Sequence, residues 1–167
     1  LKALGADGGK MLTRIALGDR STARTLQWTA DAVTRLAELG LYAMIEPFWS
    51  RWEDGRVVHD LTAAAVNRSM QVASGLGATS TRTILKVPIA PQMELVMAAT
   101  TLPTVILGGD PSTSPDQVYA AWQGALALPG VVGLTVGRTM LYPKDDDVAG
   151  AVDTAASLLR RSRPAAV

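Results

Sequence analysis

Residues 104–138 read TVILGGDPSTSPDQVYAAWQGALALPGVVGLTVGR, and this stretch carries the clearest fold signal in the chain. A short apolar run, 104–107, ends in a Gly-Gly pair, and a second run, 131–136, ends in Gly-Arg. Between them Ser114 or Pro115 can open a helix to about Leu126, because Ser caps helices and Pro is tolerated in a first turn. Apolar strands joined by a helix are typical of a parallel sheet covered by helices.

The same alternation extends toward both termini. We predict strands at 10–15, 41–46 and 81–87, and helices at 21–39, from Asp60 or Thr62 to about Gly75, at 91–99 and at 145–160. Ser21 can cap the first helix and Gly40 can end it. We expect the strand 41–46 to stop at a proline, which makes 48–60 a loop rich in tryptophan and charge. The pattern predicts one α/β domain over residues 1–167.

Two architectures fit this pattern: a doubly wound open sheet and a (β/α)8 TIM barrel. No glycine-rich loop follows the first strand, whereas glycines follow the last two strands, at the usual place of a phosphate site in a barrel. A complete barrel takes about 250 residues, and the pattern of this 167-residue chain indicates only about five βα units. We therefore expect the C-terminal part of a barrel, without its first three units.

Composition excludes several classes of site. The chain has no cysteine and one histidine, which rules out disulfides and leaves little room for a histidine-based metal site or a Ser-His-Asp triad. The net charge is +1, which gives no indication of a nucleic-acid or membrane partner. No apolar run approaches the ~20 residues of a spanning helix, so we expect a cytoplasmic protein.

Two lysines and a glutamate are the candidate catalytic residues. Lys86 lies inside an apolar strand, and a desolvated amine that loses its proton can form an imine with a carbonyl substrate. Alternatively, the Lys86 side chain extends to the rim of the barrel or pairs with a carboxylate. Glu46 closes its predicted strand and can act as a general acid or base, or it only neutralises Lys86 or Lys10. Lys10 can add positive charge to the pocket, or it is an exposed surface residue.

The two glycine turns are the candidate phosphate site. Backbone N–H groups of such turns, together with an arginine, can hold an anion; the residues are Gly108, Gly109, Gly137 and Arg138.

The loop 48–60 carries two tryptophans that could form a lid or a subunit contact, and His59 in this loop is expected to be a surface residue. Trp28 and Trp122 lie in predicted helices and are expected to be packing residues.

These motifs resemble the last four strands of the class I, Schiff-base aldolases, which include archaeal-type fructose-bisphosphate, tagatose-bisphosphate and deoxyribose-phosphate aldolases. The motifs are Glu46-Pro47, Leu85-Lys86-Val87, Leu107-Gly108-Gly109 and Val136-Gly137-Arg138. The resemblance implies that Lys86 forms the Schiff base, that Glu46 is catalytic, and that Lys10 matches a strand lysine of the tagatose type. It also implies that the glycine turns bind phosphate and that neither a metal nor another cofactor is needed.

The expected activity is reversible aldol cleavage of a phosphorylated ketose or deoxy-sugar. The expected partners are a small-molecule sugar phosphate and further copies of the chain in a homo-oligomer. Two alternatives stay open: a non-catalytic sugar-phosphate-binding barrel in which Lys86 only pairs with Glu46, and a sugar-phosphate isomerase or epimerase that uses Glu46 as a base. An open cavity where Lys86 and Glu46 converge, facing the glycine turns, would favour the aldolase.

Overall fold

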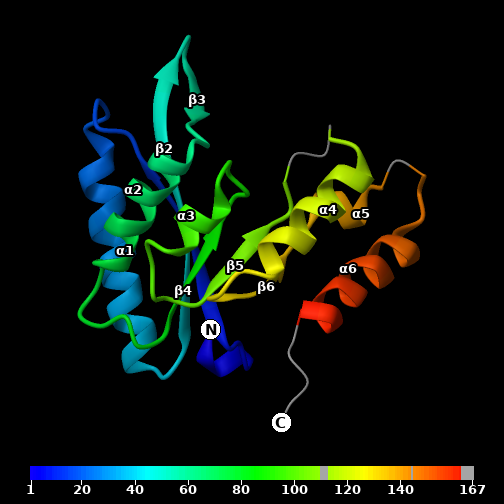
Figure 1. Ribbon diagram of the computed structural model, residues 1–167. Coiled ribbons are helices and arrows are strands. Elements are labelled where there is room, and N and C mark those ends of the chain that lie inside the picture. Colours follow the sequence, from blue (N-terminus) through cyan, green and yellow to red (C-terminus); the bar gives the residue numbers. More distant parts are fainter. Residues whose placement is uncertain (110–112, 144, 163–167) are drawn as a thin grey trace.

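The computed structural model of the chain describes residues 1–109, 113–143 and 145–162. Its centre is a sheet with the strand order β1-β2-β4-β5-β6, in which every neighbouring pair is parallel (Figure 1). The strands are β1 (Gly8–Ile15), β2 (Tyr42–Glu53), β4 (Thr83–Val87), β5 (Thr104–Leu107) and β6 (Val131–Thr135). A short strand, β3 (Arg56–His59), pairs antiparallel with the end of β2. The five parallel strands confirm the predicted partial (β/α) barrel.

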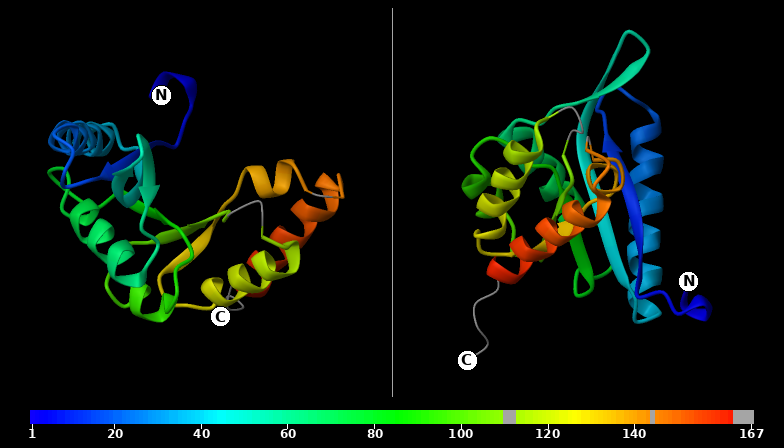
Figure 2. Two further views of the ribbon diagram at one scale, coloured as in Figure 1. Left: turned by 90° about the horizontal axis from the view of Figure 1, so that it is seen from above. Right: turned by 90° about the vertical axis from the view of Figure 1, so that its right-hand side faces the viewer.

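The helices follow the strands in turn, and all except α5 (Arg138–Leu141) lie along one side of the sheet (Figure 2). They are α1 (Ser21–Glu38), α2 (Ala63–Ser74), α3 (Met93–Met97), α4 (Pro115–Leu126), α5 (Arg138–Leu141) and α6 (Val148–Ser162), preceded by the 3-10 turn η1 (Lys2–Leu4). Viewed from above, the strands form an arc, with α1, α2, α3, α4 and α6 along its outer side (Figure 2). The inner side of the arc therefore corresponds to the interior of a barrel.

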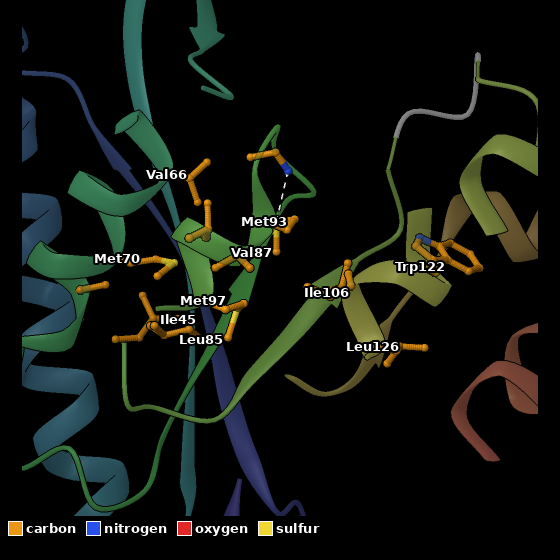
Figure 3. Packing of buried hydrophobic residues seen from close by; sticks show 14 of the residues in the cluster. Ile45, Val66, Met70, Leu85, Val87, Met93, Met97, Ile106, Trp122 and Leu126 are labelled. Carbon is orange, nitrogen blue, oxygen red and sulfur yellow. Dashed lines mark hydrogen bonds between the residues drawn. The ribbon is translucent and has the colours of Figure 1, made fainter. Parts of the chain in front are cut away.

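The hydrophobic core lies between the sheet and these outer helices. Alternate residues of the central strands point into it, including Ala43 and Ile45 from β2, Leu85 and Val87 from β4, and Ile106 from β5. They meet helical side chains that are also buried, namely Val66, Met70, Met93, Met97, Trp122 and Leu126 (Figure 3). Because side chains alternate along a strand, the residues between these core positions face the inner side of the arc.

The prediction that the second strand ends at Pro47 is wrong, because β2 continues to Glu53 and turns back into β3. Backbone N–H groups alternate along the strand: Tyr42 donates toward β1, and Ala43 donates toward β4. Pro47 therefore lacks its N–H on the β4 side, where the β2–β4 ladder has already stopped at Ile45. The proline removes no ladder hydrogen bond there, so the strand passes through it.

Several helix ends differ from expectation, although the helices themselves are present. Ser21 is not the N-cap of α1. Its backbone N–H donates to Asp19 Oδ1 at 2.8 Å, so Asp19 supplies the side-chain acceptor at this end. Thr62 caps α2 as predicted, with its hydroxyl accepting from the Ala65 N–H.

Trp122 is fully buried, as expected for a packing residue. Trp28 is exposed and lies under the guanidinium of Arg24, so the packing role predicted for Trp28 is wrong.

Candidate active site

Glu46 lies between two lysines on the inner side of the arc. Its Oε1 is 3.1 Å from Lys86 Nζ, and its Oε2 is 2.5 Å from Lys10 Nζ. The side chains of Glu46 and Lys86 are 11% and 15% exposed, whereas Lys10 is 44% exposed. The structure therefore brings the three predicted catalytic residues into one cluster, in which both carboxylate oxygens have a cationic partner.

Strand register explains why these side chains meet. Ile45 pairs with Leu85, so the next residues, Glu46 and Lys86, lie side by side and point away from the helices. On the other edge of β2, Glu46 pairs with Leu12, and Lys10 lies two residues earlier on the same face of β1. Glu46 is thus in the interior of a long strand rather than at its end, which corrects the predicted position.

The environment of Glu46 keeps it ionised. Burial on its own raises the pKa of Glu46, but hydrogen bonds from Lys10 and Lys86 and the charges of both ammonium groups lower it further than burial raises it. The net result is a pKa below the ordinary value of 4.5. At neutral pH Glu46 is therefore a carboxylate that is paired with both lysines.

The two glycine turns also lie next to each other. A Cβ atom at Gly108 would be 2.8 Å from the Cγ1 of Val136, and the Thr139 hydroxyl donates to the Gly108 carbonyl at 3.1 Å. These contacts join the end of β5 to the turn between β6 and α5. Gly109 has a φ of +81°, a left-handed conformation that favours glycine.

A cavity of about 600 Å³ opens at the carboxyl ends of the strands. Gly109 and Arg138 line it, whereas Lys10, Glu46 and Lys86 do not. Its other lining residues come from the β2–β3 hairpin, the segments after β3 and β4, the end of β5, the segment before α4, and α4 itself: Phe48, His59, Leu61, Pro88, Ile89, Leu107, Thr113, Gln117, Val118, Ala121 and Trp122. The predicted catalytic residues thus lie on the inner face, and two of the four predicted phosphate-binding residues, Gly109 and Arg138, line this cavity, whereas Gly108 and Gly137 do not.

His59, which the sequence analysis expected to be a surface residue, lines the cavity together with Phe48, which the sequence analysis did not single out. The His59 ring stacks on Phe48 with centroids 4.2 Å apart, and its Nδ1 is 2.9 Å from the Ser50 hydroxyl. Burial lowers the pKa of His59 and the positive charge of Arg14 lowers it further, while Glu46 opposes both, so the pKa lies below 6.5. The missed signal was Asp54-Gly55, a dipeptide that favours a two-residue hairpin turn and would have extended β2.

The described residues show neither a metal centre nor a membrane segment. No group of three or more His, Cys, Asp or Glu side chains among them could hold a metal ion. Within the same residues, no helix combines the length and the apolar character needed to cross a bilayer.

Sequence and structure comparisons identify the family. The model of the Cgl0159-like family matches residues 1–156. The chain belongs to the Cgl0159-like family. The crystal structure of Cgl0159 from Corynebacterium glutamicum is 51% identical, with a TM-score of 0.93 over 97% of this chain. The chain has no significant match among curated protein sequences.

The fold of this Cgl0159-like chain is also that of class I aldolases. It is 20% identical to a Schiff-base-forming fructose-1,6-bisphosphate aldolase, with a TM-score of 0.73, and 16% identical to an archaeal fructose-1,6-bisphosphate aldolase, with a TM-score of 0.75. In the archaeal structure the catalytic lysine is covalently bound to a carbinolamine intermediate. Each of the two aldolase matches covers 95% of this chain. In turn, this chain spans 54% of the length of the Cgl0159 chain and 60% of the length of each aldolase chain.

Proposed function

We propose that this Cgl0159-like chain carries the Schiff-base half of a class I aldolase that cleaves a phosphorylated ketose or deoxy-sugar. The observation that carries the proposal is the position of Lys86, on the inner face of a barrel-like sheet and 3.1 Å from a carboxylate. The fold that the chain shares with Schiff-base aldolases supports it.

In this proposal Glu46 and Lys10 prepare Lys86 for reaction. Glu46 accepts a proton from the Lys86 ammonium, which leaves a neutral amine that can attack a carbonyl carbon. The resulting carbinolamine loses water to give a protonated imine. The carbon–carbon bond then breaks as the neighbouring hydroxyl gives up its proton and becomes an aldehyde, and the imine takes up the electron pair to become an enamine. Glu46 then returns protons during release, and Lys10 keeps a positive charge beside Glu46 when Lys86 has lost its own.

The phosphate group of the substrate is held at the glycine turns in this proposal. Arg138 supplies positive charge, and the backbone N–H groups around Gly108, Gly109 and Gly137 supply donors. The contact of Gly108 with Val136 keeps both turns together, and Gly109 and Arg138 line one cavity. A phosphate there would orient the carbonyl end of the substrate toward the inner face.

A second candidate is a non-catalytic sugar-phosphate-binding barrel. The closed contact of Lys86 with Glu46, and the fact that neither residue lines the large cavity, favour this alternative. An isomerase using Glu46 as its base has no separate support in the described geometry. The aldolase and the binding protein differ in one property that can be measured, a covalent bond to Lys86.

Reductive trapping distinguishes the two candidates. The protein is incubated with dihydroxyacetone phosphate and sodium borohydride, and its peptides are analysed by mass spectrometry. We expect an adduct on the peptide that contains Lys86, no such adduct in Lys86→Met, and an adduct retained in Lys10→Met. Lys10→Met is the matched control because both lysines contact Glu46. Calorimetric binding of several sugar phosphates without any adduct on Lys86 would identify the binding protein instead.

A further inference from the structure

Part of the wall of the 600 Å³ cavity forms the next layer above Lys86 along the barrel axis. Its lining includes Phe48, Pro88 and Leu107. Phe48 and Pro88 follow Glu46 and Lys86 by two residues, and Leu107 follows Val105, the register partner of Lys86. Residues two apart along a strand share a face, so this part of the wall continues the inner face at the carboxyl ends of the strands. It therefore lies one layer beyond Lys86, which does not itself line the cavity. Val118 and Trp122, which belong to the core on the helix side, form another part of the wall.

The wall of this cavity is mainly apolar. From α4 it has Val118, Ala121 and Trp122, and Ile89 follows β4 on the opposite side. Among the described residues, the polar lining side chains are those of His59, Thr113, Gln117 and Arg138. An apolar wall with a few polar groups is typical of small-molecule sites, and the volume lies in their usual range of about 300–1,000 Å³. Hydroxyl groups placed along such a wall would lose water without gaining hydrogen bonds.

We propose that the cavity binds a phosphorylated carbonyl compound whose body consists of deoxygenated, alkyl-like carbons, in preference to a fully hydroxylated sugar chain. The proposal rests on the proposed function, since Gly109 and Arg138 hold the phosphate. The apolar wall then packs against carbon atoms, and the His59 imidazole, fixed by Ser50, is available for a single hydroxyl or carbonyl group.

Two phosphates with the same number of carbons test the preference without any imine chemistry. The protein is titrated by calorimetry with n-butyl phosphate and with erythritol 4-phosphate, which differ in three hydroxyl groups. We expect n-butyl phosphate to bind on the order of tenfold more tightly, because its chain loses apolar surface to the wall and has no hydroxyl to desolvate. Equal binding, tighter binding of erythritol 4-phosphate, or binding of neither would overturn the proposal.

A variant that fills part of the cavity tests whether the preference for n-butyl phosphate arises there. Ala121→Leu adds bulk to the lining, whereas Ala120→Leu makes the same change at an exposed position of α4 outside the lining. We expect Ala121→Leu to weaken n-butyl phosphate binding about tenfold by occupying the space, and Ala120→Leu to leave it unchanged. Ile89→Thr, in the segment after β4, is a second variant that should reduce the preference between the two phosphates. Equal affinity in all three variants would contradict the assignment.

The two proposals can fail separately. Neither phosphate has a carbonyl group, so their binding does not depend on Lys86 chemistry. A tenfold preference without a trapped adduct would keep the apolar pocket and remove the aldolase. An adduct on Lys86 without the preference would keep the aldolase and remove the apolar substrate class.

Discussion

Lys86 Nζ lies 3.1 Å from Glu46 Oε1, and the two residues project side by side from neighbouring parallel strands. Lys10 contacts the other carboxylate oxygen, so the cluster contains two positive charges and one negative charge. Glu46 is mostly buried, and a buried carboxylate is costly unless it is paired. The stability of this part of the sheet therefore depends on the ionised form of Glu46.

Glu46→Gln should lower the free energy of unfolding by about 1–3 kcal/mol at pH 7, because the variant leaves Lys86 without its carboxylate partner. The folded pKa of Glu46 lies below 4.5, so its contribution is present above pH 4.5 and is lost as the pH falls through the folded pKa. Urea unfolding at pH 7 and at successively lower pH should show the two proteins converging in acid.

Glu53→Gln is the control for this measurement. Glu53 contacts Arg51 at 2.5 Å, but half of its side chain is exposed, and exposed ion pairs contribute little. We expect a change of at most about 0.5 kcal/mol in Glu53→Gln at pH 7. A difference between wild type and Glu46→Gln that did not shrink in acid would show that the Glu46 charge does not stabilise the fold.

The pKa of His59 can be followed directly, because it is the only histidine in the chain. Its imidazole signal in NMR should titrate below pH 6.5, since burial and the Arg14 charge both disfavour the protonated ring. Arg14→Met should raise this pKa, and Glu46→Gln should lower it further. The stability linked to His59 is present above pH 6.5 and is lost as the pH falls through the folded pKa. A titration at or above 6.5 in the folded protein would contradict this environment.

The fold and the meeting of Lys86 with Glu46 could be predicted from sequence for a physical reason. Buried parallel strands appear as short apolar runs, and alternation along each strand places every second residue on the same face. The polar residues inside such runs, Lys86 and Glu46, must share the face that does not carry the core. Register between neighbouring strands then brings them into contact.

The extent of β2 and the cavity could not be predicted from local patterns alone. Pro47 normally ends a strand, and only the early end of the β2–β4 ladder shows that its missing N–H has no consequence. The cavity wall combines side chains from the hairpin, from the segments after β3 and β4, from β5 and from α4, which are distant in sequence. His59 becomes part of the site only because the hairpin returns it to Ser50 and Phe48.

The hairpin that carries His59 depends on a glycine with a left-handed backbone. Asp54 and Gly55 have φ angles of 47° and 73°, as a two-residue turn with both residues left-handed requires. Gly55→Ala should therefore lower the free energy of unfolding by about 1 kcal/mol, because the new side chain disfavours this conformation. Gly124→Ala makes the same change in α4, where the added methyl group meets no atom within 4 Å. That variant should instead gain about 0.5–1 kcal/mol through helix propensity. Urea unfolding of both variants checks the opposite signs, and a loss of stability in both would show that the turn conformation is not the cause.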